Sequence, residues 1–357
     1  MTADASLKAW LALSLTKGLG GESARRLLKE FASPEAIFNA SSLSLKSIVK
    51  PSVAVALGNG IDEARLNESL AWLNDSNNHL VTLADQDYPQ SLLNIPDPPI
   101  LLYVKGRLDL LNHTGLGIVG SRNATPQGIN NAENFARTLS DAGLCIISGM
   151  AHGIDAAAHR GGLQGQGSSI AIVGTGLDKV YPAANRDLAH ALAAQGALIS
   201  EFPLGTPPLA ANFPRRNRLI SGMSTGSLVV EASLQSGSLI TARLALEQNR
   251  DVFAIPGSIH SPHSKGCHAL IKQGAKLVES AQDILEELGG FSTINRASPA
   301  ENSGHEILAQ LGYDPVDIDT LGNRCGLTMA ELSAMLLTLE LEGHISSLPG
   351  GLYQRTH

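Results

Sequence analysis

This 357-residue sequence has few cysteines and no long apolar run, which argues against disulfides, membrane spans and a signal peptide. The three cysteines, Cys145, Cys267 and Cys325, lie far apart without a CxxC spacing, which indicates reduced thiols in a cytosol. No apolar run reaches the length of roughly 18 residues that a membrane-spanning helix needs. The apolar stretch at residues 9–15 is too short and too weakly basic in its lead-in for a signal peptide. We therefore expect a soluble, cytoplasmic protein with no membrane contact.

An excess of positive charge is also missing. The formal net charge is −7, so the protein as a whole is not typical of a nonspecific polyanion binder. Any nucleic-acid site must therefore be a local basic patch. Apolar residues make up 43% of the chain, which is ample for a sizeable core. At roughly 100–200 residues per domain, the length predicts two or three domains.

The first 114 residues divide into a helical part and a connector. Residues 1–80 show helical patterns and no strand signal, with a glycine turn at Gly18–Gly21. This arrangement resembles a SAM or helix-hairpin-helix domain, whose turn amides could hold a DNA phosphate, but ordinary helix packing explains the glycines as well. Residues 81–114 begin with four prolines in a short stretch, which predicts an extended connector.

Residues 115–290 alternate strand-length apolar runs with helical segments. The expected strands are residues 116–120, 144–148, 170–173, 197–201, 228–231, 251–255 and 276–279, and the expected helices include 127–142, 186–195 and 239–249. Continuous apolar strands with crossover helices predict a parallel sheet covered on both faces. The fold class is therefore α/β, with an extended Rossmann-like core whose ligand site lies at the carboxyl ends of the strands.

The turn after the first of these strands has the composition of a phosphate site. Gly120, Ser121, Arg122 and Asn123 stand just ahead of a helix, so backbone amides, a hydroxyl and a guanidinium can converge on a phosphate. A plain strand-to-helix turn capped by Thr125 is the alternative. Both can hold, but the cap does not require Arg122.

A dinucleotide fold does not fit the details. The first turn spells Gly117-Ile-Val-Gly120 rather than GxGxxG. The next strand ends in Ser148-Gly149-Met150 rather than in the acidic residue that would hold a ribose. We therefore expect no NAD and no other cofactor.

Two groups of titratable residues raise the question of a metal or catalytic site. His152, Asp155 and His159 have the spacing of one helix face, but the helix has only just begun at His152 and a structural role is favoured. A loop cluster of His260, His263, Cys267 and His268 matches no zinc spacing. We expect neither a metal site nor a catalytic residue.

The stretch from Asn212 to Ala242 combines basic and aromatic residues with a helix start. Arg215, Arg216 and Arg218 fall on more than one helix face, so one or two should face a ligand and another should pair with an acid. Phe213 suits either stacking on an unpaired base or core packing. Ser236-Gly237-Ser238, followed by Thr241, predicts a second anion site at a helix start.

These motifs resemble the DNA-processing protein A (DprA/Smf) family over nearly the whole chain. The matching runs are GIVGSRNAT (117–125), SGMAHGIDAAAH (148–159), VGTGLDKVYPAANRDL (173–188), SEFPLGTPPLAANFPRRNRLISGMS (200–224) and EASLQSGSLITARLALEQNRDVFAIPG (231–257). The resemblance implies a cytoplasmic homodimer that binds and protects incoming single-stranded DNA. It also implies loading of RecA during natural transformation, without catalysis, and single-strand-binding protein as a further partner candidate.

The resemblance also implies the site residues. The arginine of the GSR turn is Arg122, and the Asn-Phe-Pro-x-Arg-Asn-Arg run begins at Asn212. The chain departs from the family pattern at Ala210 and Ala211, where many members carry a basic residue, and at His268 in place of asparagine. The expected DNA-binding residues are Gly120, Ser121, Arg122, Asn123, Asn212, Phe213, Arg215, Arg216, Asn217, Arg218, Gly237, Ser238, Thr241 and Lys265.

The last part of the chain has the pattern of a winged helix. Residues 291–304 are polar and unpatterned and indicate a linker, and residues 305–357 predict a winged-helix-like domain. Its helix at residues 328–341 contains no lysine or arginine, and Glu331, Glu340 and Glu342 would repel duplex phosphates. We expect a protein-interaction or structural role for this domain.

Two other classes of function remain as alternatives. Glu231 and the SGS-LIT turn are similar to the phosphate-binding turn of lysine-decarboxylase-like phosphoribohydrolases, which would make the chain a nucleotide enzyme. A pure interaction scaffold would suit the acidic charge. It would leave Arg122 and the arginine run unexplained, and single-stranded DNA binding is therefore preferred.

Overall fold

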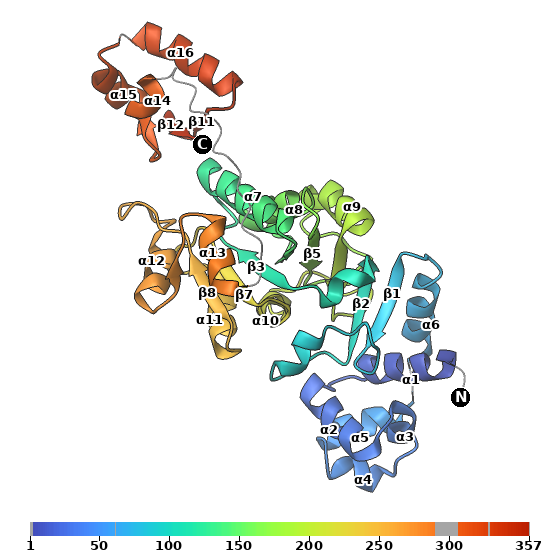
Figure 1. Ribbon diagram of the computed structural model, residues 1–357. Coiled ribbons are helices and arrows are strands. Elements are labelled where there is room, and N and C mark those ends of the chain that lie inside the picture. Colours follow the sequence, from blue (N-terminus) through green and yellow to red (C-terminus); the bar gives the residue numbers. More distant parts are fainter. Residues whose placement is uncertain (1–2, 61, 290–305, 328, 357) are drawn as a thin grey trace.

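The computed structural model describes residues 3–60, 62–289, 306–327 and 329–356. Figure 1 shows the N-terminal helices at one end, the α/β part in the middle and the C-terminal helices and strands at the other end. Among the described residues, no helix is long and apolar enough to cross a membrane.

Six helices form the N-terminal part. They are α1 (Ala3–Leu15), α2 (Gly21–Phe31), α3 (Pro34–Phe38), α4 (Ser42–Lys46), α5 (Pro51–Gly58) and α6 (Glu63–Trp72). The side chains of Ser33, Ser41 and Asp62 each accept a hydrogen bond from a backbone N–H of the helix that follows, which fixes three of the helix starts. The buried core of these helices continues into Leu101 and Tyr103, so they pack directly on the sheet.

Two strands lie where the sequence analysis expected none. β1 (Asn78–Thr82) pairs antiparallel with β2 (Leu101–Gly106), and β2 pairs antiparallel with β6 (Ala197–Ser200). The expectations of helices alone before residue 81 and of a simple connector after it are wrong in this respect. The four prolines of the connector all precede Leu101, so none of them removes a hydrogen-bond donor from β2.

The central sheet has nine strands in the order β1-β2-β6-β5-β4-β3-β7-β8-β9. Its remaining strands are β3 (Gly115–Val119), β4 (Cys145–Ser148), β5 (Ser169–Ile172), β7 (Gly226–Val229), β8 (Asp251–Ala254) and β9 (Lys276–Leu277). From β6 to β9 every pairing is parallel, which confirms the α/β class. The order reverses between β3 and β7, and such a switch point opens a crevice at the carboxyl ends of the strands.

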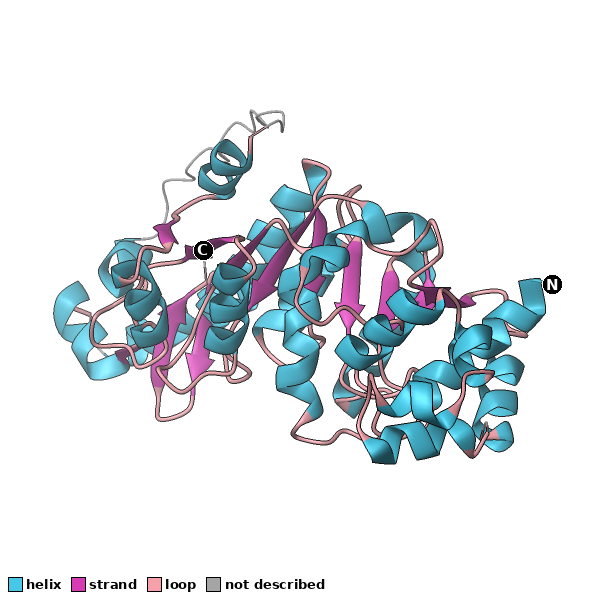
Figure 2. Ribbon diagram, turned by 90° about the horizontal axis from the view of Figure 1, so that it is seen from below, coloured by secondary structure: helices cyan, strands magenta, loops and turns pink. Residues whose placement is uncertain are grey.

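Helices cover both faces of the sheet, as Figure 2 shows. One face is covered by α7 (Pro126–Asp141), α8 (Ile154–Gly162), α9 (Arg186–Gln195) and α13 (Ala281–Leu288), and the other by α10 (Asn212–Met223), α11 (Ser238–Glu247) and α12 (Lys265–Lys272). Successive strand residues point to opposite faces of the sheet and belong to the two hydrophobic cores there. Ile146 lies in one core and Ile147 in the other. Because both faces are buried, the strands consist of continuous apolar runs. Three short 3₁₀ helices, η1 (Gln90–Asn94), η2 (Leu108–Asn112) and η3 (Ala183–Asn185), complete this part.

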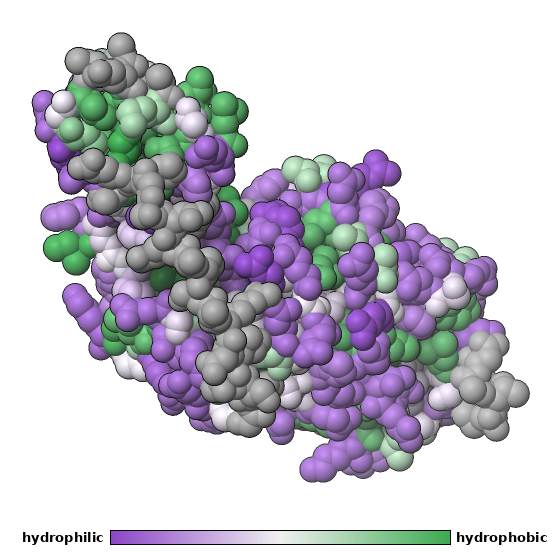
Figure 3. Space-filling model, turned by 45° about the horizontal axis from the view of Figure 1, so that its top comes forward, coloured by the Kyte–Doolittle hydropathy of each residue, from purple (hydrophilic) through white to green (hydrophobic). Residues whose placement is uncertain are grey.

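The C-terminal part has the winged-helix arrangement that the sequence predicts. It consists of α14 (Glu306–Leu311), β10 (Val316–Asp317), α15 (Ile318–Cys325), α16 (Met329–Leu341), β11 (Ile345–Leu348) and β12 (Leu352–Arg355). Gly350 and Gly351 have φ values of 90° and 73° and so permit the hairpin between β11 and β12. Figure 3 shows hydrophobic side chains on the surface of this part.

Candidate nucleic-acid interface

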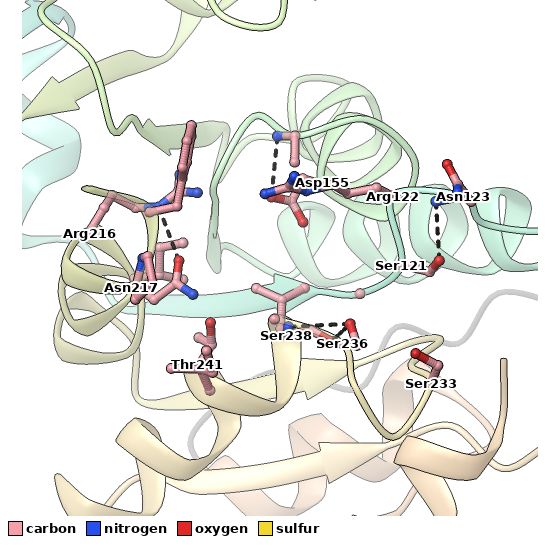
Figure 4. Close-up of a pocket in the computed structure, with 18 of the residues that line it drawn as sticks. Ser121, Arg122, Asn123, Asp155, Arg216, Asn217, Ser233, Ser236, Ser238 and Thr241 are labelled. Atoms are coloured by element: carbon pink, nitrogen blue, oxygen red, sulfur yellow. Dashed lines mark hydrogen bonds between the residues drawn. The ribbon is translucent and has the colours of Figure 1, made fainter. Parts of the chain in front are cut away.

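A cavity of about 450 Å³ lies at the switch point between β3 and β7. Three segments form its walls: the turn after β3, one side of α10, and the turn between β7 and α11. Residues Ala151 and Asp155, which follow β4, close it from a fourth direction. Figure 4 shows the polar side chains of these segments around the hollow. The predicted residues at this cavity are Gly120, Ser121, Arg122, Asn123, Phe213, Arg216, Asn217, Gly237, Ser238 and Thr241.

The turn after β3 is held in place by its neighbours. Ser121 Oγ accepts a hydrogen bond from the N–H of Asn123 at 3.2 Å, and the carbonyl of Ser121 accepts one from the N–H of Ile154 at 3.1 Å. Gly153 has φ +73°, and a Cβ there would lie 2.3 Å from the Ser121 oxygen. Thr125 caps α7, since its Oγ1 accepts a hydrogen bond from the N–H of Gly128 at 3.0 Å. The cap and the cavity therefore use the same turn.

Arg122 is the exposed cation of the cavity. Its Cζ lies 5.7 Å from the centroid of the half-buried Phe213 ring, so guanidinium and ring form a cation–π pair. Phe213 itself lines the cavity, and a Cβ on Gly174 would lie 3.2 Å from the ring. The ring therefore packs against the backbone and also borders the cavity, and its stacking on an unpaired base stays a prediction.

Arg216 lies beneath the cavity, with only 4% of its surface exposed. Its Nη1 donates to the carbonyls of Gly149, at 2.6 Å, and Ile172, and its Nε donates to Asn217 Oδ1 at 3.2 Å. Burial lowers the pKa of Arg216 to about 10, although the nearby carboxylate of Asp155 favours the charged form. A Cβ on Gly149 would lie 2.4 Å from Nη1, so glycine is required for this close approach. The buried cation places positive charge against the floor of the cavity.

The other two arginines of the run do not line the cavity. Arg218 Nη2 lies 2.5 Å from Glu201 Oε2, and Arg215 Nη2 lies 3.1 Å from the same oxygen. The side chain of Glu201 is only 3% exposed, and this burial raises the pKa of its carboxyl against the opposing effect of both arginines. Residues 215, 216 and 218 diverge by about 100° per position around α10, which explains the separation. The expected arginine–acid pairing is formed by Arg215 and Arg218 with Glu201, and the predicted contact of these two arginines with DNA stays a prediction.

Two more expected contacts are occupied elsewhere. Asn212 Nδ2 donates to the carbonyl of Gly174 at 3.0 Å, which holds the start of α10 against the end of β5. Lys265 Nζ donates to the carbonyl of Ile259, within its own loop. Neither residue lines the cavity.

The start of α11 forms the third wall. Ser236 Oγ and Ser238 Oγ lie 2.7 Å apart, and the N–H of Ser238 donates to Ser236 Oγ at 3.3 Å. Gly237 is the cap residue and Thr241 is almost fully buried at the cavity. The start of this ten-residue helix therefore borders the cavity. Ser233, which the sequence analysis missed, completes this wall.

The residues after β4 have structural roles, as the sequence favours. α8 begins only at Ile154, after His152. Asp155 Oδ2 accepts from the N–H groups of Gly149 and Ala151 at 3.2 and 3.3 Å, and burial raises the pKa of this carboxyl. Asp155 thus holds the loop after β4 in place and is also the acidic residue that lines the cavity.

His159 is fully buried and neutral. The hydroxyl of Ser169 donates to the carbonyl of Ile146 at 2.7 Å, so His159 Nδ1–H donates to Ser169 Oγ at 2.7 Å and Nε2 accepts from the N–H of Met150 at 3.3 Å. Burial lowers the pKa of His159 to about 3. Within the described ranges, no group of three or more His, Cys, Asp or Glu residues is placed to hold a metal ion.

Glu231, the acid of the alternative enzyme, lies outside this cavity. Its two carboxylate oxygens accept from the N–H of Thr125 at 3.0 Å and from Thr125 Oγ1 at 2.6 Å. It borders a separate space of about 1280 Å³ between the α/β part and the C-terminal part. Its carboxylate therefore anchors the start of α7 rather than facing the arginines.

An α/β sheet with an anion-suited cavity at its switch point, followed by a winged helix, defines a class of nucleotide-binding or nucleic-acid-binding protein. Family models sharpen this class: residues 79–289 match DNA recombination-mediator protein A, and residues 295–351 match the DprA winged helix domain. The chain therefore belongs to the DprA family of DNA recombination mediators.

Similar proteins agree with this assignment. Protein Smf of Escherichia coli is 46% identical over 80% of each chain, and Protein Smf of Synechocystis is 34% identical over 97% of this chain and 98% of its own. The crystal structure of DprA from Streptococcus pneumoniae superimposes with a TM-score of 0.71 and 38% identity, covering 80% of this chain and 98% of that one. DprA from Helicobacter pylori, whose structure was described for its single-stranded DNA binding mode, has a TM-score of 0.54 and 30% identity, covering 59% of this chain and 95% of that one.

Proposed function

We propose that this chain binds single-stranded DNA in the cavity between β3, β7 and α10, as a cytoplasmic recombination mediator. The observation that supports the proposal most is the convergence of Arg122, Arg216, Phe213 and the start of α11 on one cavity. The single-stranded DNA binding of the Helicobacter pylori relative also supports it.

Each wall of the cavity has a different part in this proposal. Arg122 contacts a phosphate from the exposed side, and the N–H of Gly237 with the hydroxyl groups of Ser236 and Ser238 approaches another from the helix start. Phe213 stacks on an unpaired base, which contributes about 1–3 kcal/mol. Four other predicted residues do not contact the strand in this proposal, because their side chains bond to other protein groups. They are Asn212, Arg215, Arg218 and Lys265.

Arg216 strengthens the site from beneath. Arg216 and Asp155 are both buried, so the screening of their charges by solvent is small. Binding is therefore expected to depend little on sequence, because backbone phosphates and a ring face read no base identity.

We further propose the biological role that the family resemblance implies. The protein protects incoming single strands and loads RecA onto them during natural transformation, as a homodimer in which two cavities share one strand. Single-strand-binding protein is a further partner in this scheme. No chemical step is proposed, since Glu231 is held by Thr125 and faces away from the arginines.

The test is binding of fluorescent oligo-dT and of a matched duplex to the full-length protein and to Arg122→Ala. The wild type should prefer the single strand, and the variant should lose about tenfold or more in affinity, since a charged hydrogen bond contributes about 1.5–3 kcal/mol. Arg160→Ala is the matched control, because Arg160 is exposed and pairs with Glu133 away from the cavity.

Two outcomes would contradict the proposal. Equal affinity for single strand and duplex would remove the single-strand preference. An Arg122→Ala variant that binds as tightly as Arg160→Ala would move the site elsewhere on the molecule. Turnover of a nucleoside monophosphate, which the proposal does not expect, would restore the enzyme alternative.

A further inference from the structure

The loop after β5 places a second aromatic ring beside the cavity. Tyr181 is 44% exposed, and its ring centroid lies 5.7 Å from that of Phe213 with a tilt of 42° between the planes. Tyr181 does not line the cavity, and in the sequence it stands within the run 173–188 without an assigned role. One side of the ring rests on Phe213, and much of the remainder faces solvent.

The residues next to Tyr181 border a second hollow. Lys179 and Val180 line a space of about 470 Å³, together with Trp72 of α6 and Lys105 of β2. Met150 and Val173, which follow β4 and β5, also belong to its walls, so this hollow opens along the same carboxyl edge of the sheet. Tyr181 therefore stands between the two hollows.

We propose that Tyr181 stacks on the base next to the one held at Phe213, so that the strand leaves the cavity over Tyr181 toward the second hollow. This inference rests on the function proposed above and gives the bound strand a direction. The two rings are already in contact, so the base stacks on the outer face of Tyr181 rather than between them. Lys179, whose Nζ donates to the carbonyl of Gly205 at 2.7 Å, adds a cation along this route.

The opposite route is less suited to a single strand. Asn123 borders both the cavity and the space of about 1280 Å³ beside the C-terminal part, where Tyr313 is the exposed tyrosine. The Arg355 guanidinium lies 4.9 Å from the centroid of the Tyr313 ring and occupies one of its faces. Each space has two acids in its walls, Glu231 and Asp314 here and Asp75 and Asp178 in the second hollow. Only the second hollow also has lysines among its lining residues, Lys105 and Lys179. A phosphate backbone is therefore better accommodated on the Tyr181 side.

Oligo-dT of increasing length tests the direction with four forms of the full-length protein: wild type, Tyr181→Leu, Tyr181→Phe and Tyr313→Leu. We expect Tyr181→Leu to weaken binding of long oligonucleotides about tenfold and to leave the shortest ones that bind unchanged, because only a longer strand reaches the ring. Tyr181→Phe keeps the stacking face and should bind as the wild type does. Tyr313→Leu, a matched loss of an exposed tyrosine, should have no effect.

Each other outcome overturns the inference in a recognisable way. A Tyr181→Leu protein that binds every length as tightly as the wild type shows that no base stacks there. Equal weakening at all lengths shows that Tyr181 only supports Phe213, and weakening by Tyr313→Leu alone assigns the opposite route. Photocrosslinking of 5-iodouracil-substituted oligo-dT to Tyr181 gives an independent readout if Tyr181→Leu folds poorly.

These outcomes differ from failure of the proposed function itself. If the wild type does not bind oligo-dT, or if Arg122→Ala binds normally, the cavity is not the site and the question of direction does not arise. If the wild type binds oligo-dT and Arg122→Ala weakens the binding, the series of oligonucleotide lengths tests the role of Tyr181 alone.

Discussion

The cavity at the sheet edge and the surface of α16 belong to two folds that can both bind nucleic acid, yet their charges differ. The cavity presents Arg122 on its rim and Arg216 in its floor, against one acid, Asp155. The α16 sequence contains no lysine or arginine, and its residues Leu337 and Leu341 are 58% and 82% exposed. We therefore expect charge and exposed apolar surface, rather than fold type, to decide that the cavity binds a strand and that the surface of α16 contacts a protein.

Two acidic residues of the C-terminal part, Glu340 and Asp317, have structural contacts. Glu340 Oε1 accepts from the N–H and the hydroxyl of Ser347 at 3.1 and 2.6 Å, and Asp317 caps α15 by accepting from the N–H of Thr320 at 2.8 Å. Glu331, one of the acids on which the sequence prediction relied, has a side chain outside the described residues. The prediction of a protein-interaction or structural role for this domain therefore stays a prediction.

The largest expected effect concerns the buried cation of the cavity. Arg216→Ala removes the donor to the carbonyls of Gly149 and Ile172 and leaves Asp155 without its nearby cation. At about 1.5–3 kcal/mol per charged hydrogen bond, we expect the free energy of unfolding to fall by about 3–5 kcal/mol in urea titrations.

Arg215→Ala is the matched control one position earlier on α10. Arg215 is 52% exposed, and Arg218 still pairs with Glu201 after its loss. We expect a change of no more than about 1 kcal/mol. Equal stability of the two variants would mean that Arg216 is not essential to the floor of the cavity.

The next effect is a pH dependence of stability that arises in the α/β part, at His159. The pKa of His159 is about 3 in the folded state and near 6.5 when unfolded, so the unfolded state binds more protons between these values. The contribution of neutral His159 is therefore complete above pH 6.5 and is lost as the pH falls toward 3. Between pH 8 and pH 5 this loss should lower the free energy of unfolding by about 2 kcal/mol.

Urea unfolding of His159→Gln and His344→Gln at pH 8 and pH 5 checks this expectation. His159→Gln should be less stable at pH 8 but should lose less on acidification than the wild type. His344→Gln, at a partly exposed residue of the C-terminal part, is measured in parallel as the control. An unchanged pH dependence in His159→Gln would show that another group is responsible.

A smaller effect is expected in the salt dependence of DNA binding. Each phosphate neutralised on a single strand contributes about −0.7 to the slope of log affinity against log salt. Arg122→Ala should therefore reduce the slope by about 0.7, whereas Arg324→Ala in the C-terminal part should not change it. Arg324 Nη1 already donates to the carbonyl of Gln310 at 3.1 Å, which makes it a suitable control. A smaller slope for Arg324→Ala would place a phosphate on the C-terminal part.

Local pattern was enough to predict much of the fold and most of the cavity. Buried parallel strands are continuous apolar runs, so their positions and the glycine turn before Arg122 could be found from the sequence. The strand β2 was missed because the prolines before Leu101 dominate the composition of that segment. Its pairing with β6 is a contact between residues far apart in sequence, which local periodicity does not report.

The site shows the same limit. Which arginine faces the cavity depends on the partner of each: Glu201 holds Arg215 and Arg218, and the backbone near Gly149 holds Arg216. Those partners come from β6 and from the loop after β4, so the sequence around α10 contains no sign of the choice. Tyr181 was missed for the same reason, since its neighbour Phe213 lies on another element.

The smallest expected effect is that of removing the C-terminal part altogether. A protein ending at residue 289 loses three arginines: Arg296, which lies outside the described residues, and Arg324 and Arg355, whose side chains are engaged by Gln310 and Tyr313. It also loses the hydrogen bond from Asn130 to the carbonyl of Thr356 at 2.9 Å, which lies on α7 away from the cavity. Because neither Arg324 nor Arg355 lines the cavity, affinity for oligo-dT in an anisotropy titration should stay within about twofold of the full-length value. A loss of about tenfold or more would show that the winged helix contacts the strand, and the contrast between the two regions would then fail.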